Sequence, residues 1–244
     1  MTTQPADPRL LLARTAWILA DEGHESGLAG QLTVRGPRPD SFWTLPLGLA
    51  FEEAGVDTML LLDDAMNVID GAGAFGVREP NPATRFHLWT YRARPDVNAI
   101  VHTHPPACSA LAAARVPLKV AHMDATPFAD DIAFLPEWPG LPTADREGEI
   151  ISAALGGKHA ILLANHGMLT AGRSVQEAAF LAVFMERMAR LQLDAEAAGG
   201  AKAVEHGEAI RARDFLRSDR IINITFDAWA RRAERRRAAI IKGN

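Results

Sequence analysis

Residues 99–110 read AIVHTHPPACSA, an apolar run that ends in two histidines and two prolines. Side chains alternate along an extended backbone, so Ile100, His102 and His104 leave the same side of it. The segment predicts a buried strand, followed by a short helix after Pro106. Two imidazoles about 6–7 Å apart at their Cα atoms can converge on one metal ion. Two polar residues at the junction of a strand and a loop would have the same spacing, so this pair alone leaves both readings open.

Outward from this segment, helical and strand patterns alternate along the whole chain. Apolar spacing, caps and prolines predict helices over 7–22, 81–97, 145–157 and 174–200, with a basic helix in the last forty residues. Short apolar runs predict strands within 27–36, 41–46, 57–71, 131–142 and 159–167. Mixed short strands and helices without a repeat or a linker indicate a single layered domain of the α/β or α+β class.

The composition is that of an ordinary globular protein. The chain has 244 residues, of which 48% are hydrophobic and 23% are charged, and its net charge is −4. This mild charge gives no electrostatic case for nucleic acid or for a membrane surface as partner. The single cysteine, Cys108, excludes an internal disulfide and fits a reducing compartment. No apolar run approaches the roughly 18 residues of a membrane span, so we expect a cytoplasmic protein.

A third histidine has a context similar to that of the first two. His166 lies in LLANHGM, after an apolar run and before a glycine. Three imidazoles that leave a fourth position open are typical of a catalytic metal site, whereas structural sites are closed by four protein ligands. The remaining histidines lack such a context, and we expect ordinary structural or solvated roles for them.

Several motifs in order resemble the class II aldolase/adducin family. They are GLAGQLTVRG (27–36), TLPLGLAFEE (44–53), ARPDVNAIVHTHPP (93–106), NHGMLTAG (165–172) and EAAFLAVFMERMARLQL (177–193), and the resemblance covers roughly residues 8–200. It implies a three-layer α/β/α domain around a mostly antiparallel mixed sheet. It also implies a homotetramer with active sites between subunits, and a divalent metal on His102, His104 and His166.

Within that resemblance we expect the domain to span residues 1–205. We expect residues 206–244 to form a C-terminal helical tail that packs on the domain or on a neighbouring subunit. Zinc is the first expectation for the metal, with manganese, iron and cobalt as alternatives. The partner would be a small-molecule substrate.

The segment EPNPATRFHL (79–88) departs from the pattern of the family's aldolases. Those enzymes carry a glutamate that serves as proton-transfer base, and Ala83 stands at its position here. An alanine methyl group cannot abstract a proton, and general base catalysis is worth about 10²–10⁴-fold. Glu79 is a candidate catalytic substitute or a fourth metal ligand, although a surface loop residue would look the same.

The residues that hold a substrate phosphate in those aldolases are also altered. Their serine pair corresponds to Asn81-Pro82, their hydroxyl residue before the turn glycine Gly48 corresponds to Leu47, and their asparagine corresponds to Gln31. Leucine and proline side chains donate no hydrogen bond. The sequence therefore disfavours a phosphorylated substrate, while Gln31, Gly48 and Asn81 remain candidates for substrate binding.

Two further residues are candidates for catalysis. Arg85 could hold a substrate carboxylate with two hydrogen bonds, or it could make a surface ion pair. Asp124 follows an expected apolar strand and could relay a proton, or it could lie in a polar loop. The tyrosine that serves the aldolases as proton donor has no counterpart, since the single tyrosine, Tyr91, falls inside an expected helix.

Loss of the base and of the phosphate contacts favours decarboxylation over aldol cleavage. We therefore expect a metal-dependent carbon–carbon lyase that decarboxylates an unphosphorylated acid, either a hydroxylated aromatic (dihydroxyphthalate-like) acid or a 2-oxo acid. Three alternatives stay open at this point. They are a class II aldolase on an unphosphorylated 2-oxo acid or aldehyde, an iron-dependent oxygenase, and a non-catalytic adducin-like interaction domain.

Overall fold

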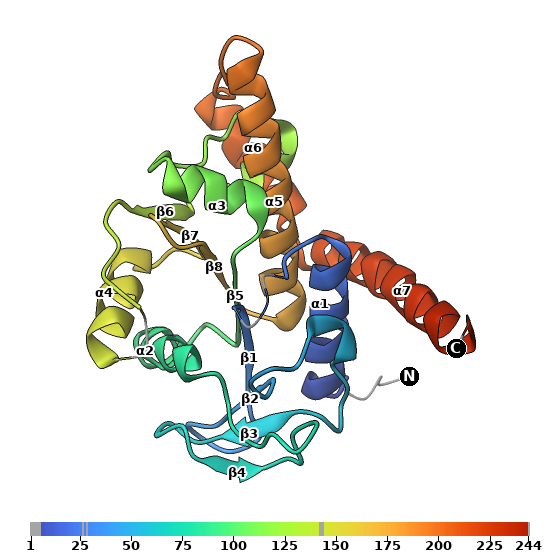
Figure 1. The fold of residues 1–244 in the computed structure, drawn as a ribbon. Coiled ribbons are helices and arrows are strands. Elements are labelled where there is room, and N and C mark those ends of the chain that lie inside the picture. The colour runs from blue at the N-terminus through green and yellow to red at the C-terminus, as the bar shows by residue number, and fades with distance from the viewer. Residues whose placement is uncertain (1–5, 26, 28, 142–143, 244) are drawn as a thin grey trace.

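One mixed sheet forms the centre of the molecule (Figure 1). The computed structural model describes residues 6–25, 27, 29–141 and 144–243, with side chains to residue 239. In this part of the chain the sheet has eight strands in the order β4-β3-β2-β1-β5-β8-β7-β6. The strands are β1 (Gln31–Arg35), β2 (Phe42–Thr44), β3 (Leu60–Leu62), β4 (Val68–Asp70), β5 (Ala99–Thr103), β6 (Ile132–Leu135), β7 (Ala160–Leu163) and β8 (Met168–Gly172). Every neighbouring pair is antiparallel except β6 and β7, which confirms the expected sheet.

Helices cover both faces of the sheet, as the three-layer expectation requires. The α-helices are α1 (Pro8–Asp21), α2 (Arg85–Ala93), α3 (Pro106–Ala113), α4 (Asp145–Leu155), α5 (Val175–Ala197), α6 (His206–Leu216) and α7 (Asp219–Gly243). Short 3₁₀ helices are η1 (Phe51–Glu53), η2 (Pro82–Thr84) and η3 (Met123–Phe128). Helices α2 and α4 pack together on one face, and α1, α3, α5 and α7 form the layer on the other (Figure 1).

Strand β5 illustrates how side-chain alternation builds two cores. Ala99 and Val101 belong to the core shared with α1, α3, α5 and α7, whereas Ile100 belongs to the core under α2 and α4. His102 has the same parity as Ile100 and therefore faces the α2 side of the sheet. The Phe86 ring of α2 contacts it there, with ring centroids 4.9 Å apart.

Capping side chains and prolines mark the ends of the helices, as the sequence predicts. The Asp7 side chain accepts a hydrogen bond from the backbone N–H of Arg9 at the start of α1, and the Ser174 side chain accepts one from Glu177 at the start of α5. The helix expected over 81–97 begins as η2 at Pro82 and continues as α2. It ends at Ala93, because the residue before Pro95 is pushed away from helical geometry.

Two sequence expectations about strands are wrong. The sequence assigned one strand to 159–167 and none after it, but β7 ends at Leu163 and a tight turn leads into β8, all of whose residues are buried. The strand expected before Asp124 is absent, since residues 117–121 have no regular structure and η3 follows them. Pro117 lacks the N–H that a sheet ladder needs, which weakens this segment as a strand.

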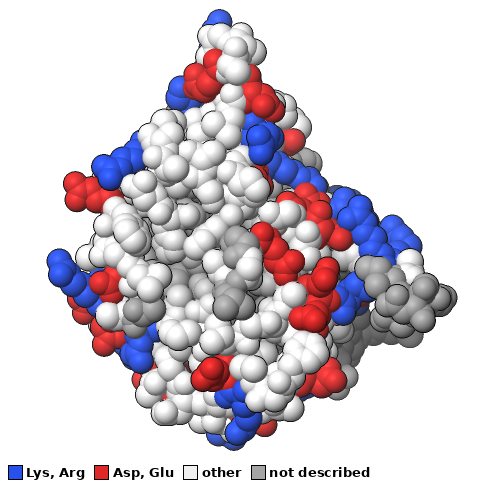
Figure 2. All heavy atoms as spheres, viewed as in Figure 1, with Lys and Arg blue, Asp and Glu red and all other residues white. Residues whose placement is uncertain are grey.

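The C-terminal tail packs on the rest of the chain. Helix α7 lies against α1 and α5, and its apolar residues, Trp229 and Phe226 among them, belong to the same core as those helices. Figure 2 shows Lys and Arg side chains gathered along α7, and Arg232 and Arg236 of this helix form ion pairs with Asp21. Within the described residues, no helix combines the length and the apolarity that crossing a bilayer requires.

Candidate metal centre

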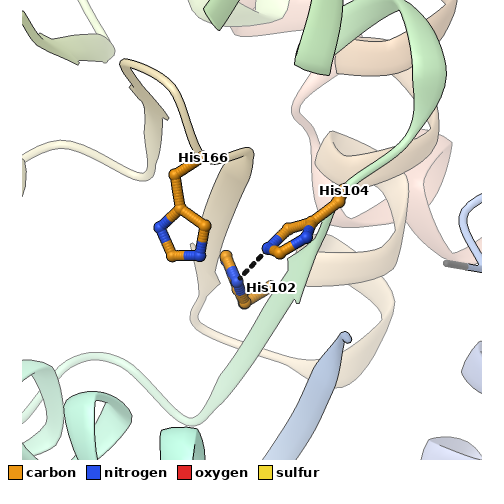
Figure 3. A group of neighbouring side chains, drawn as sticks. All are labelled: His102, His104 and His166. Carbon is orange, nitrogen blue, oxygen red and sulfur yellow. Dashed lines mark hydrogen bonds between the residues drawn. The ribbon is translucent and has the colours of Figure 1, made fainter. Parts of the chain in front are cut away.

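Three histidines from two parts of the sequence meet at one end of two neighbouring strands (Figure 3). His102 lies near the end of β5, His104 follows that strand, and His166 lies in the turn between β7 and β8. Strands β5 and β8 are antiparallel, and Thr103 pairs with Met168. The end of β5 and the turn before β8 are therefore adjacent, which brings His166 beside the other two rings.

The three imidazoles are spaced for a shared ion. Their ring centroids are 4.7–4.8 Å apart in each pair. The Nε2 atoms of His102 and His104 are 3.0 Å apart, close to the separation of about 3.3 Å that two nitrogens take around a tetrahedral zinc ion. Among the described residues, His102, His104 and His166 form the one group of three or more potential ligand side chains close enough to hold a metal.

A hydrogen bond fixes the tautomer of His102. Its Nδ1 lies 2.8 Å from the backbone oxygen of Met168. A carbonyl oxygen can only accept, so Nδ1 carries the proton and Nε2 presents its lone pair to the other two rings. Metal-binding histidines commonly have such a backbone partner on the second ring nitrogen. The donor set thus fits a divalent ion of the imidazole-binding class, such as zinc.

Burial keeps these imidazoles neutral. It lowers the pKa of His102 well below its ordinary value, and positive charge on His166 or His104 would lower it further. Burial likewise lowers the pKa of His166 to about 4, and it lowers the pKa of His104. Neutral imidazole is the form that binds metal, so the three side chains are ready to bind an ion at neutral pH.

A glycine makes room for His104. A Cβ atom on Gly167 would lie 2.5 Å from the Cδ2 atom of His104 and 2.6 Å from the backbone oxygen of Thr103. Asn165, two residues earlier, has a φ of 56°, a left-handed conformation that asparagine adopts more readily than most residues. The ANHG turn therefore has the residue types that place His166 and His104 next to each other.

A buried carboxylate holds the chain just after His104. Glu186 of α5 accepts hydrogen bonds from the backbone N–H groups of Ala107 and Cys108, both 2.8 Å long, at the start of α3. Pro105 precedes this helix and offers no side-chain cap. Glu186 was missed by the sequence analysis. The sequence did hold one sign of such a residue. Pro105 stands at the N-cap position of α3 and its side chain cannot accept a hydrogen bond, so an acceptor for the first N–H groups of this helix has to come from another segment.

The three expected substrate-binding residues line one pocket, and one of them, Gln31, neighbours the triad. Gln31 of β1 pairs directly with His102 of β5, so the two side chains are on the same face of the sheet. Gln31, Gly48 and Asn81 all line one small pocket.

The three expected catalytic side chains make their contacts elsewhere. Glu79 is exposed, and its backbone oxygen accepts a hydrogen bond from Leu47 at the rim of the same pocket. The Arg85 guanidinium lies 3.2 Å from the carboxylate of Asp145, and the Asp124 carboxylate lies 3.9 Å from His122. In the described part of the chain, no hydrogen bond or ion pair of these three side chains reaches the triad, so their roles stay predictions.

Ala83 is half-buried in η2 and packs against the core under α2. It precedes Phe86 by three residues, so the two lie on the same side of this helical segment. Because Phe86 contacts His102, position 83 is on the side of the segment nearest the metal centre. A short methyl group occupies the position that the family resemblance gives to the catalytic glutamate.

Two characterised enzymes are among the relatives of this chain. It is 34% identical over 182 residues to a 4-hydroxy-3-prenylphenylpyruvate oxygenase/4-hydroxy-3-prenylbenzoate synthase of Streptomyces roseochromogenus subsp. oscitans, a match covering 74% of this chain and 64% of that protein. The chain thus spans less than two thirds of that relative. It is also 30% identical over 212 residues to a 3,4-dihydroxyphthalate decarboxylase of Arthrobacter keyseri, covering 80% of this chain and 82% of the relative.

A solved structure shares the fold over nearly the whole chain. It is an L-fuculose 1-phosphate aldolase from Glaciozyma antarctica PI12, with a TM-score of 0.87, 29% sequence identity, and coverage of 98% of this chain and 96% of that one. The family model for the Class II Aldolase and Adducin N-terminal domain matches residues 11–193. The chain therefore belongs to the class II aldolase/adducin family.

Proposed function

We propose that this protein is a metal-dependent decarboxylase of an unphosphorylated acid, either a hydroxylated aromatic acid or a 2-oxo acid. The observation that carries the proposal is the pairing of three neutral imidazoles with Ala83 on the nearby helical segment. Aldol cleavage in the family's sugar-phosphate aldolases uses a carboxylate base at that position. Decarboxylation begins with loss of CO₂ and needs no proton abstraction from carbon.

His102, His104 and His166 would hold the ion, with zinc as the proposed metal and manganese, iron or cobalt as alternatives. A divalent ion there would supply Lewis-acid stabilisation of the negative charge that develops on a substrate oxygen as CO₂ leaves. The chain itself orients His102 through its hydrogen bond to the backbone oxygen of Met168. It also provides a pocket beside His102 whose described lining carries no charged side chain.

A proton must then reach the carbon that lost CO₂. Among the candidates, Glu79 is joined by its backbone to Leu47 at the pocket rim, and we propose that its side chain takes up a proton from solvent water and passes it to this carbon. Arg85 could exchange its exposed partner Asp145 for the substrate carboxylate. We also propose that the protein is a homotetramer, and that Asp124 relays a proton in a site formed between its subunits.

The relatives support this reaction class in different degrees. The similarity to a 3,4-dihydroxyphthalate decarboxylase extends over four fifths of both chains. The aldolase with the same fold has a phosphorylated substrate in its name, but Leu47 and Pro82 of this chain donate no hydrogen bond to a phosphate.

One relative favours a second candidate function, an iron-dependent oxygenase. The protein from Streptomyces roseochromogenus subsp. oscitans is named as an oxygenase and is 34% identical to this chain. Imidazole ligands with open positions also suit Fe(II), so the histidine triad is compatible with oxygen chemistry.

The test is a screen for CO₂ release. Protein loaded with Zn²⁺, Mn²⁺, Fe²⁺ or Co²⁺ is incubated with hydroxylated aromatic acids and 2-oxo acids, with and without oxygen. Metal-dependent CO₂ release in the absence of oxygen supports the decarboxylase. Release that requires both Fe²⁺ and oxygen supports the oxygenase, and cleavage to an aldehyde without CO₂ supports the aldolase.

Substitution of His102, His104 or His166 by alanine should abolish metal binding and activity while the protein stays folded. Each change leaves too few donors to compete with water for the ion. His206→Ala is the matched control, because this exposed histidine of α6 pairs with Asp130 instead. Metal content and turnover are measured for each variant. Full metal content and turnover in any of the three triad variants would contradict the assignment.

A further inference from the structure

Two buried polar atoms without partners line the pocket beside His102. Gln31 is 5% exposed and Thr84 is fully buried. The Oε1 atom of Gln31 and the Oγ1 atom of Thr84 form no hydrogen bond in the structure. Both residues line the same pocket, which lies between β1, the segment 44–51 and η2. We call this pocket the Gln31–Thr84 notch.

The other polar side chains of the notch are already used. Thr44 donates to the backbone oxygen of Leu32, and the side-chain oxygen of Asn81 accepts from the backbone N–H of Ala83. A buried polar atom without a hydrogen-bond partner destabilises a protein, so two in one pocket indicate a group that completes them. Gln31 and Thr84 are therefore the side chains positioned to receive that group.

The chemistry of the notch favours a hydroxyl group over a phosphate. Its described lining contains no lysine, arginine or histidine. An amide oxygen needs a hydrogen-bond donor, and a phosphate dianion has none. The notch has a volume of about 20 Å³, on the order of one water-sized group. A neutral hydroxyl fits this space, since it can donate to Gln31 and accept from Thr84.

The notch is also adjacent to the metal centre. Gln31 and His102 are directly paired in the register of β1 and β5, which places their Cβ atoms roughly 5 Å apart. A substrate held at the histidine triad could therefore extend one polar group into the notch.

We infer that the notch binds a hydroxyl group of the substrate, and that Thr84 is a specificity-determining residue through this contact. The inference rests on the proposed function in that it assumes a substrate at the triad. It adds the requirement that this substrate carries a neutral hydroxyl.

The test measures binding without turnover. Zinc-loaded full-length protein is titrated with 4-fluorophenol and with 4-fluoroanisole, its methyl ether, and binding is followed by ¹⁹F NMR. Inorganic phosphate is added as a competitor. The variants are Thr84→Val, which keeps the shape and removes the hydroxyl, and Thr84→Ser, which keeps the hydroxyl. The matched control is Thr90→Val, because Thr90 is equally buried on α2 with an unpartnered hydroxyl but does not line the notch.

We expect 4-fluorophenol to bind the unmodified protein about tenfold more tightly than 4-fluoroanisole. Thr84→Val should reduce phenol binding to the level of the ether, while Thr84→Ser and Thr90→Val should keep it, and phosphate should not compete. Equal phenol binding in Thr84→Val, or displacement of the phenol by phosphate, overturns the inference. Selective phenol binding together with no CO₂ release in the screen above would instead overturn the proposed decarboxylation and leave the notch assignment standing.

Discussion

A methyl group at position 167 would collide with the metal centre. Its Cβ atom would lie 2.5 Å from the His104 ring and 2.6 Å from the Thr103 backbone oxygen, so one of them must move. Gly167→Ala should therefore displace His104 and weaken zinc binding by roughly 10–100-fold, the range seen when the support of a metal ligand is disturbed. Competition with a chelator measures the zinc affinity.

Gly157→Ala is the control for this substitution. A Cβ atom on Gly157 meets no atom within 4 Å, and its φ lies outside the left-handed region. Its zinc affinity should equal that of the unmodified protein. If Gly167→Ala binds zinc as tightly as Gly157→Ala does, the ring of His104 is not held by this close contact.

Restoring a glutamate at position 83 distinguishes the two lyase reactions. In a decarboxylase, Ala83→Glu adds a carboxylate near the metal centre and repels an acidic substrate. Turnover of the acid should fall at least about tenfold, which corresponds to about 1.4 kcal/mol of barrier. An aldolase that had only lost its base would gain carbon–carbon cleavage to an aldehyde. Both activities are assayed in both proteins, and faster aldehyde formation without CO₂ would favour the aldolase.

At the scale of elements, the contact between α5 and α3 determines how the chain leaves the metal centre. Glu186 satisfies two N–H groups at the start of α3, which follows His104 by two residues. Glu186→Leu leaves both groups buried without an acceptor, and at about 1–3 kcal/mol for each group the free energy of unfolding should fall by about 2–6 kcal/mol. Glu186→Gln retains one acceptor oxygen and should lose less. Urea unfolding measures both.

Glu196→Gln is the matched control on the same helix. Glu196 forms an exposed ion pair with Lys119 and caps no helix. Exposed pairs of this kind contribute little to stability, so the control should unfold close to the unmodified protein. A loss as large in Glu196→Gln as in Glu186→Leu would mean that the charge of α5, and not the cap of α3, is what matters.

At the scale of the whole molecule, buried histidines make stability depend on pH. Burial lowers the pKa of His87 to about 3, and burial together with the charge of Arg187 lowers the pKa of His24 to about 3. In the unfolded chain each would have its ordinary pKa near 6.5. The unfolded state therefore binds more protons below pH 6.5, so this stability is fully present above pH 6.5 and is lost as the pH falls towards 3.

At pH 5 each of these two histidines should have lost about 2 kcal/mol of its contribution. The measurement is the free energy of unfolding in urea at pH 7 and pH 5. His87→Asn removes a hydrogen bond to Thr33, so it should lower the free energy of unfolding at both pH values. The difference in this free energy between pH 7 and pH 5 should become smaller by about 2 kcal/mol, the contribution of one histidine. An unchanged difference in His87→Asn would contradict the assignment of the pH effect to this residue.

Elements were predicted correctly where a few neighbouring residues determine them. The strand and helix around the HxH pair were predicted because alternation and proline act within a few residues. Strand β8 was missed because it is five residues long, follows β7 after a tight turn, and has small and apolar residues on both faces. The strand before Asp124 was expected from its apolar residues, and Pro117 outweighed them.

Spacing, caps and prolines act between neighbouring residues, so the sequence by itself indicated a layered α/β or α+β domain and singled out His102, His104 and His166. The three-layer fold and the shared metal were expectations from the family that its ordered motifs resemble. Only the tertiary structure decided which buried side chains surround the metal centre and which partners they have. Glu186 reaches the start of α3 from 79 positions away, and Gln31 of β1 and Thr84 of η2 line the same pocket. Whether a buried polar atom finds a partner depends on how distant segments pack, and packing follows from the arrangement of the whole sheet, which no short stretch of sequence specifies.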